Sequence, residues 1–187
     1  NQPIRPQASL AARLTEAHLA VRSCFFCRKC SAGCPLTFAM DLLPHHVIRL
    51  ALLGQEDRVF GSETIWVCAA CQTCTTRCPN GVDLAGVMDW LKEEAIKTGA
   101  AIPDKDVATF HRFFLESVNA SGGRLSEGQL LRRYMRYKMR RQLNLEELKD
   151  NLKLGWKLWQ RRRMRLVGPA ALRGQAEIKE IFRKGDF

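Results

Sequence analysis

Eight cysteines carry the clearest chemical pattern of this sequence, and all of them lie between residues 24 and 78. They form two runs with the same C-x2-C-x2-C-x3-C-P spacing. The first run is Cys24, Cys27, Cys30 and Cys34, followed by Pro35, and the second is Cys68, Cys71, Cys74 and Cys78, followed by Pro79. Thiolates at this spacing hold a [4Fe–4S] cluster. The repeated pattern predicts two [4Fe–4S] clusters and leaves no cysteine over.

The spacing also predicts which thiolates serve each cluster. Three ligands that stand two residues apart can reach three irons on one side of a cluster, so the fourth ligand comes from the opposite side. In two-cluster proteins with this run, the fourth cysteine binds the other cluster. We therefore expect cluster I on Cys24, Cys27, Cys30 and Cys78, and cluster II on Cys68, Cys71, Cys74 and Cys34.

Three other uses of the cysteines fit the pattern less well. Four disulfides would suit a secreted chain, but no secretory leader is recognisable and a cytoplasmic location is expected. A zinc site of four thiolates is typically built from two separated C-x2-C pairs, not from a tight triplet with a fourth ligand and proline. Buried free thiols would not need the same spacing twice.

Helices are expected to position the two runs. Apolar residues recur at helical spacing, Ser, Asp and Pro stand at the expected starts, and Gly54 and Gly99 stand just past two of the expected ends. No convincing strand alternation is present, so the predicted fold class is all-α. His45 and His46 are expected to be surface or packing residues. The helices are predicted over residues 9–22, 43–53, 62–68 with Ser62 as the cap, 83–98, 104–121, 126–142 and 144–166.

Charge is distributed unevenly along the 187 residues. Residues 1–123 carry 12 basic and 12 acidic side chains, whereas residues 124–187 carry 18 basic and 7 acidic ones. The formal net charge of +11 therefore belongs to the last third. We expect a cluster-binding helical domain over residues 1–123 and a basic helical extension for subunit docking over residues 124–187.

The extension contains a predicted basic amphipathic helix that begins with an Asn144–Glu147 capping box. Such a helix can dock on a partner subunit, which we favour, or make a peripheral membrane contact. Nucleic-acid binding is not expected, because Trp156 and Trp159 of this helix both fall on its apolar side. A transmembrane segment is not expected either, because the sequence has no run of about 18 apolar residues. The apolar side carries Leu145, Leu148, Leu152, Trp156 and Trp159, and the adjoining side carries Lys149, Lys153, Lys157 and Arg161.

The chain resembles the α-helical ferredoxin and, more particularly, the C-subunit family of heterodisulfide reductase. The likeness covers roughly residues 20–140. It rests on the two cysteine runs, the Pro44 helix between them and Ile65-Trp66-Val67-Cys68, and then on Gly99, Phe113-Phe114 and Gly123-Arg124-Leu125-Ser126-Glu127. One departure is that many relatives have glycine after the second cysteine of each run, where this chain has Arg28 and Gln72.

The resemblance implies an electron-transfer subunit without catalytic residues of its own. Such a subunit passes electrons through two [4Fe–4S] clusters, from an A-type subunit that contains flavin to a B-type subunit that reduces a disulfide. Because no cysteine follows Cys78, the chain lacks the cysteine-rich domain of such a reductase site. The alternative is the iron–sulfur subunit of another anaerobic or sulfur-oxidising dehydrogenase complex. A succinate-type subunit is disfavoured, since its plant-type C-x4-C-x2-C run is absent.

Overall fold

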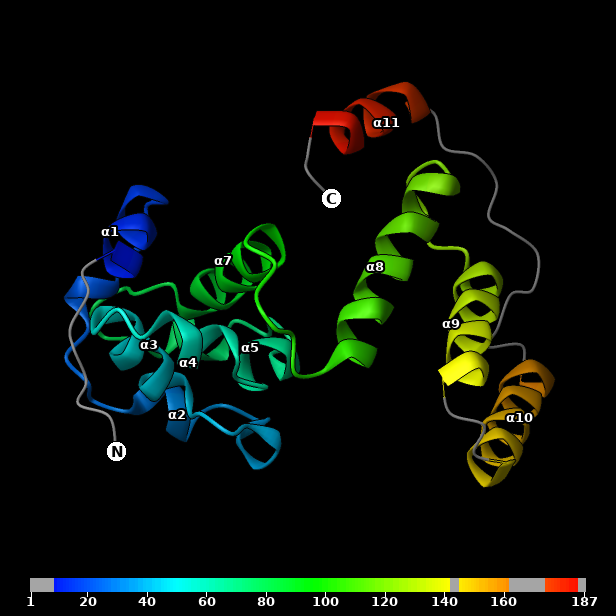
Figure 1. Cartoon of the computed structure of the whole chain (residues 1–187), viewed down its shortest axis with the longest axis horizontal. Helices are drawn as coiled ribbons and strands as arrows, with labels where there is room; N and C mark the ends of the chain where they lie inside the picture. The colour runs from blue at the N-terminus through cyan, green and yellow to red at the C-terminus, as the bar shows by residue number, and fades with distance from the viewer. Residues whose placement is uncertain (1–8, 142–144, 162–173, 185–187) are drawn as a thin grey trace. The chain divides into compact units, whose positions relative to one another are not determined.

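The computed structural model describes residues 9–141, 145–161 and 174–184, and these residues are helical, without a strand (Figure 1). The expected all-α fold class is confirmed. The chain divides into two compact units, Asn1–Val107 and Ala108–Phe187. This boundary differs from the sequence-based division after residue 123, which stays a prediction, and each unit is described by itself below.

The first unit is a cluster of short helices around one long helix. Its core combines the apolar sides of five of these helices, and Leu14, Ile48, Ile65, Met88 and Leu91 are fully or almost fully buried in it. The elements are α1 (Ser9–Glu16), α2 (Lys29–Ala32), α3 (Pro44–Leu52), α4 (Glu56–Phe60), α5 (Thr64–Val67), α6 (Thr73–Thr76) and α7 (Leu84–Lys97), with 3-10 turns at Val21–Ser23 and Thr37–Ala39.

Helix α7 has the ends that the sequence predicts. The Asp83 carboxylate accepts a hydrogen bond from the Gly86 N–H at 3.0 Å, which satisfies one of the free donors at a helix start. Past the other end, Gly99 has a φ of +66°, a conformation that glycine adopts without strain. Between these ends the predicted apolar stripe is buried, as Val87 and Leu91 illustrate.

Helix α1 is shorter than predicted. The expected helix over residues 9–22 was wrong in its second half, because His18 adopts the left-handed conformation, with a φ of 61°. The Leu19 N–H then donates to the Leu14 carbonyl at 2.9 Å, and this closing bond ends the helix. Val21 is buried, and it lies in the 3-10 turn that leads to the first cysteine.

The predicted helix before the second cysteine run exists as α5, but Ser62 does not cap it. The Ser62 hydroxyl donates instead to the Val59 carbonyl at 2.8 Å. The cap is the carboxylate of Asp41, which accepts from the Glu63 N–H at 3.1 Å and from the Thr64 N–H at 3.0 Å. The Thr64 hydroxyl adds a bond of 2.7 Å to the same carboxylate. Asp41 therefore ties the end of the first cysteine segment to the start of the second.

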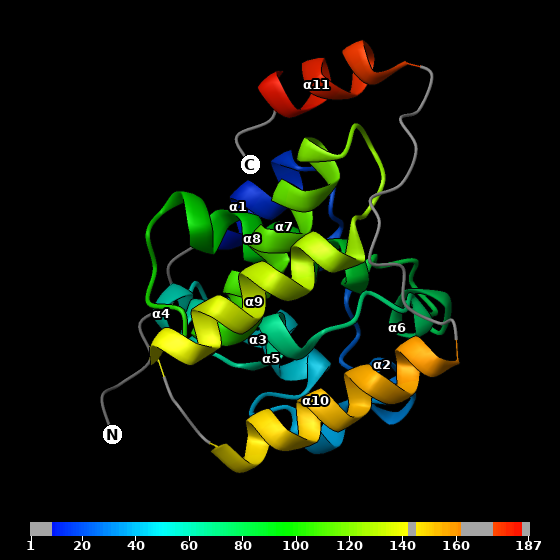
Figure 2. The ribbon, with the colours of Figure 1, turned by 90° about the vertical axis from the view of Figure 1, so that its right-hand side faces the viewer.

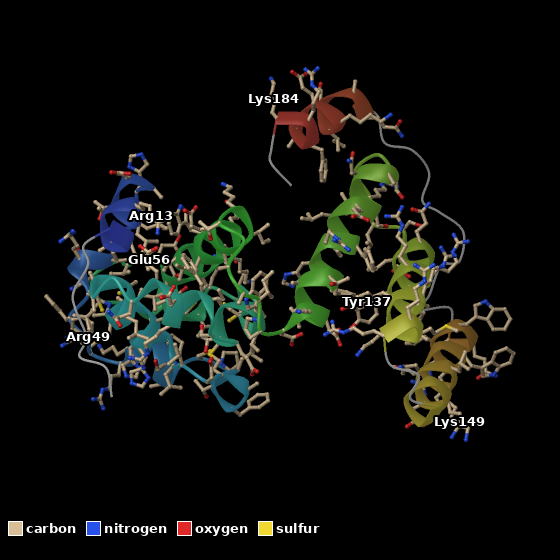
Figure 3. The ribbon with its side chains drawn as sticks, viewed as in Figure 1. Arg13, Arg49, Glu56, Tyr137, Lys149 and Lys184 are labelled. Carbon is tan, nitrogen blue, oxygen red and sulfur yellow. The ribbon has the colours of Figure 1, made fainter. Side chains whose placement is uncertain are left out.

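Arg13 joins three helices of the first unit. Its guanidinium pairs with Glu56 of α4 at 2.8 Å and with Glu94 of α7, and it lies over the ring of Trp90. Figure 3 labels Arg13 and Glu56 where α1 approaches α4. Because these charges are only partly exposed, each ion pair is screened less than a surface pair. The side chain thus holds α1 in place beside the first cysteine run.

The second unit contains α8 (Lys105–Ala120, which begins at the end of the first unit), α9 (Glu127–Arg141), α10 (Leu145–Gln160) and α11 (Gln175–Lys184). Figures 1 and 2 show α8 and α9 side by side. Edge-to-face ring contacts join them, Phe110 to Tyr134 and Phe113 to Tyr137. Beside these rings, Ser117 exchanges hydrogen bonds of 3.2 Å with the backbone of Ser126. Predicted helix 104–121 is thus confirmed, with Phe110 and Phe114 partly exposed.

The basic amphipathic helix is present as α10, and the chain after it contains α11, which the sequence did not predict. The Asn144–Glu147 capping box and the continuation to Leu166 lie outside the described residues, as do the side chains of Leu145 and Leu148. Within the residues that the structure describes, no helix has the length and apolar character needed to cross a membrane.

Replacing Asp41 tests the long-range cap. Burial acts to raise the pKa of Asp41, but the hydrogen bonds from Thr64 and Glu63 outweigh it and lower the pKa. The cap therefore stabilises the fold at neutral pH and is lost only as the pH falls through this lowered pKa. We expect Asp41→Asn to reduce the free energy of unfolding by about 1–2 kcal/mol at pH 7, measured by anaerobic denaturation.

The matched control is Asp57→Asn, which removes an exposed carboxylate of α4. Its effect should stay within about 0.5 kcal/mol. Equal losses in the two variants would show that the Asp41 carboxylate is no more than a surface charge.

Candidate metal centre

The first cysteine run forms a tight loop around its own thiols. Cys24 follows the 3-10 turn, and the Phe26 N–H donates to the Cys24 Sγ at 3.4 Å. Phe26 and Arg28 both adopt the left-handed conformation, with φ of 54° and 63°, so the chain coils around Cys27 between them. The short helix α2 then carries Cys30 into the buried interior.

The second run repeats this backbone 44 residues later. Ala70 and Gln72 occupy the equivalent left-handed positions, with φ of 50° and 63°, and α6 carries Cys74 as α2 carries Cys30. Arg28 and Gln72, where many relatives have glycine, therefore stand at positions that need a positive φ. Glycine suits these positions because it adopts a positive φ without strain. Arg28 and Gln72 both have exposed side chains.

The two loops face each other through their short helices. Helix α2 packs against α6. The Arg77 side chain lies so close to Gly33 that a Cβ built on this glycine would approach the Arg77 Cδ to 2.5 Å. Gly33 and Arg77 each precede the fourth cysteine of their run, so this contact brings Cys34 and Cys78 toward the opposite loops.

A depression in the first unit gathers thiols from both runs. It is lined by the first three cysteines of the first run and by Cys78 of the second, together with Arg28 and His45. Its empty volume is about 330 Å³, open solvent included. Cys34 lies close enough to the second run for its charge to contribute, after burial, to the raised pKa of Cys68. The structure thus places each fourth cysteine beside the run to which it does not belong.

The thiols differ in exposure, and this affects how readily they ionise. Burial raises the pKa of Cys30, Cys68 and Cys74, whereas a hydrogen bond with the Thr73 hydroxyl, 3.4 Å away, lowers the pKa of exposed Cys71. Cys27, the counterpart of Cys71, is also exposed. Iron binds thiolates, so cluster assembly on the buried thiols must release protons.

The donor set fits an iron–sulfur cluster. Eight thiols are the soft ligands that such clusters use. Backbone N–H groups point at the sulfurs, as in the bond of 3.3 Å from the Val82 N–H to the Cys78 Sγ. In the described part of the chain, no three Cys, His, Asp or Glu side chains stand close enough together to hold a single metal ion.

Several neighbours of the cysteines carry no signal in a single sequence. The Ser31 hydroxyl lies 2.7 Å from the His45 Nδ1, and it accepts a hydrogen bond from the His45 N–H at 3.1 Å. His45 is partly buried, and burial, followed by the charges of His46 and Arg28, lowers its pKa. His46 is exposed, as expected. Lys92 of α7 donates to the Cys68 carbonyl at 3.0 Å and so steadies the second loop.

Comparison with known proteins identifies the segment that carries this site. Residues 20–82, which include both loops, match the family described as a 4Fe-4S dicluster domain. This segment is a 4Fe-4S dicluster domain. Such a domain binds two [4Fe–4S] clusters, and the chain supplies the eight cysteines that they need.

The curated relatives of this chain are subunits of heterodisulfide reductases. This chain is 33% identical over 88 residues to the C subunit of the H(2):CoB-CoM heterodisulfide,ferredoxin reductase of Methanothermobacter marburgensis. The aligned segment covers 46% of this chain and 48% of that protein. The chain is 35% identical over 91 residues to the C2 subunit of the H(2)/formate:CoB-CoM heterodisulfide,ferredoxin reductase of Methanococcus maripaludis, covering 48% and 49%. The chain spans about half the length of the curated relatives that it matches. The resemblance to the C-subunit family of heterodisulfide reductase is confirmed.

The left-handed position in the second loop generates a stability prediction. A side chain other than glycine costs about 1–2 kcal/mol in this conformation, partly offset by the greater freedom of glycine in the unfolded chain. We expect Gln72→Gly to stabilise the holoprotein by about 0.5–1 kcal/mol in thermal denaturation. Glu93→Gly, on the exposed side of α7, should destabilise it by about 1 kcal/mol. A loss of stability in both variants would contradict the assigned strain.

Proposed function

We propose that this protein is the electron-transfer subunit of a complex of the heterodisulfide reductase type. Two [4Fe–4S] clusters supply one-electron transfer, and the chain's own residues hold and insulate them. The observation that carries the proposal is the depression that gathers three thiols of one run and the fourth thiol of the other. Two clusters whose fourth ligands are exchanged between the runs in this way are held side by side in one domain, which is the arrangement that a short electron relay requires.

The proposed ligand sets follow from this crossing. Cluster I is held by Cys24, Cys27, Cys30 and Cys78, and cluster II by Cys68, Cys71, Cys74 and Cys34. The lining of the depression supports the first set, and the interaction between Cys34 and Cys68 supports the second. With every cysteine engaged, the chain has no thiol left for disulfide chemistry, so its proposed role is non-catalytic.

The proposed partners are a flavin-containing subunit and a subunit that reduces a disulfide. The named relatives support a partner that acts on a heterodisulfide, since they are C-type subunits of CoB-CoM heterodisulfide,ferredoxin reductases. The chain would work in the cytoplasm, between a reductant oxidised at the flavin and a heterodisulfide reduced on the other subunit. In this scheme it conducts electrons and makes no bond itself.

Helix α10 is the proposed partner contact of the second unit. The rings of Trp156 and Trp159 contact each other in a tilted arrangement with centroids 5.2 Å apart, yet they remain 59% and 48% exposed. Exposed apolar side chains of this size need a covering surface. Lys153 and Lys157 follow along the neighbouring side of the helix and would orient the encounter with an acidic partner surface. Peripheral membrane contact is the competing use of this helix.

Replacing the fourth cysteine of each run by serine tests the crossed ligand sets. We expect Cys78→Ser to perturb cluster I and Cys34→Ser to perturb cluster II. The Mössbauer and EPR spectra of the reduced variants should therefore resemble those of Cys24→Ser and Cys68→Ser, respectively. The wild type should contain about eight irons and eight sulfides. If Cys34→Ser instead reproduces the spectra of Cys24→Ser, the ligands are not crossed, and zinc without sulfide would overturn the proposal as a whole.

Removal of the α10 aromatic surface tests the partner contact. We expect Trp156→Ser/Trp159→Ser to leave iron content and visible absorption unchanged but to abolish co-purification with the partner subunits. Ile96→Ser, which removes an apolar side chain of the first unit that is 61% exposed, is the control. Unimpaired assembly of the double variant would refute the contact, and selective loss of flotation with anionic vesicles would assign the helix to the membrane.

A further inference from the structure

The two cluster loops share a backbone but carry different side chains. At equivalent positions the first loop has Phe25, Arg28 and Lys29, whereas the second has Ala69, Gln72 and Thr73. The left-handed φ is 63° at both Arg28 and Gln72. Because small and neutral residues satisfy this backbone in the second loop, the aromatic and basic residues of the first loop are not required for its conformation.

These side chains of the first loop point outward. Phe25 is 76% exposed, and Arg28 and Lys29 are exposed beside it. Arg22, in the preceding 3-10 turn, is exposed as well. The sequence has no acidic residue between Glu16 and Asp41. Within the described residues, none of these three cations has a carboxylate within ion-pair distance.

Arg49 extends the same surface from helix α3. Its guanidinium lies 4.8 Å from the centroid of the Phe26 ring, which anchors it to the loop by a cation–π contact. Figure 3 labels Arg49 on the outer side of α3. The surface of Arg22, Phe25, Arg28, Lys29 and Arg49 is called the basic aromatic patch below.

The basic aromatic patch includes the neighbours of exposed Cys27 in the first loop, and two of its members, Phe25 and Arg28, line the depression assigned to cluster I. A [4Fe–4S] cluster on four thiolates carries about two negative charges, which repel an approaching anionic protein. The cations of the first loop offset this repulsion, whereas the loop around Cys71 has only neutral side chains at the equivalent positions. The two loops therefore present different electrostatic surfaces to partners.

We propose that the basic aromatic patch is the docking site of an electron-transfer protein whose contact surface is rich in carboxylates. The inference rests on the proposed function, and it adds the chemistry of the partner at cluster I. Opposite charges steer the encounter, and exposed Phe25 provides an apolar contact within the patch. A protein fits this site better than a nucleic acid or a membrane, because Arg28 and Lys29 directly follow the cluster ligand Cys27, where a redox partner must approach closely.

The test replaces three residues of the first loop by their equivalents from the second loop, in the full-length holoprotein. The variant Phe25→Ala/Arg28→Gln/Lys29→Thr places the residues of the second loop on the first. The control Ile96→Ala/Arg58→Gln/Lys97→Gln removes one exposed apolar and two exposed basic side chains elsewhere in the first unit. The probes are an immobilised acidic plant-type ferredoxin and, separately, heparin and phosphatidylserine vesicles, at ionic strengths from about 0.01 to 0.3 M.

We expect the wild type and the control to bind the ferredoxin with equal, salt-sensitive affinity and the loop variant to bind at least about tenfold more weakly. Equal binding of the variant and the control would overturn the inference, as would binding of the wild type to heparin or vesicles but not to ferredoxin. Iron content and visible absorption are measured on the same samples. Absence of clusters from the wild type would refute the proposed function, whereas intact clusters with unchanged ferredoxin binding would refute only the docking site.

A reciprocal variant guards against a misfolded first loop. Ala69→Phe/Gln72→Arg places an aromatic and a basic side chain on the second loop, whose backbone already has the required conformation. It should gain affinity for the acidic ferredoxin about threefold or more, with intact clusters. An unchanged affinity would show that local charge beside a cluster loop does not control docking.

Discussion

The contact between α2 and α6 is the constraint on which the first unit depends. Each of these short helices carries the third cysteine of its run, and each is followed by the fourth. Only when the helices touch can Cys78 reach the depression lined by the first run. At this contact the Arg77 side chain fills the space next to Gly33, so a side chain at this position would require Arg77 to move. The 33 residues between the runs therefore fold back on themselves, and Asp41 fixes the return of the chain by capping α5.

The cluster loops depart from relaxed backbone geometry twice each. Phe26, Arg28, Ala70 and Gln72 hold positive φ without being glycine, and such residues persist only where the surroundings fix them. Here the surroundings are the core beneath, which includes Ile65 and Leu84, and the bonds that anchor each loop, such as the one from Lys92 to the Cys68 carbonyl. In the second loop the strained residues are Ala and Gln, so the strain comes from the cysteine spacing and not from bulky side chains.

The sequence predicted the features that are written in local patterns. The cysteine spacing, the Asp83 cap and the apolar stripe of α7 are of this kind, and such patterns were enough to predict the long helices. It failed where a contact over many residues decides: the cap of α5 comes from Asp41, and Ser31 meets His45 across 14 positions. The early end of α1 also escaped prediction, because the left-handed turn occurs at His18 instead of at a glycine. Helices of four residues, such as α2 and α6, lack the repeats that periodicity needs.

The two units differ in how they bury apolar surface, and this difference bears on function. The first unit encloses a core of aliphatic side chains from five helices. In the described part of the second unit, Leu130 is the buried large apolar side chain, while Phe114, Leu152 and Trp156 remain partly or largely exposed. A unit that leaves so much apolar surface in water gains little stability from its own core. Its helices are therefore suited to complete their packing against another surface, whereas the first unit encloses an apolar core of its own.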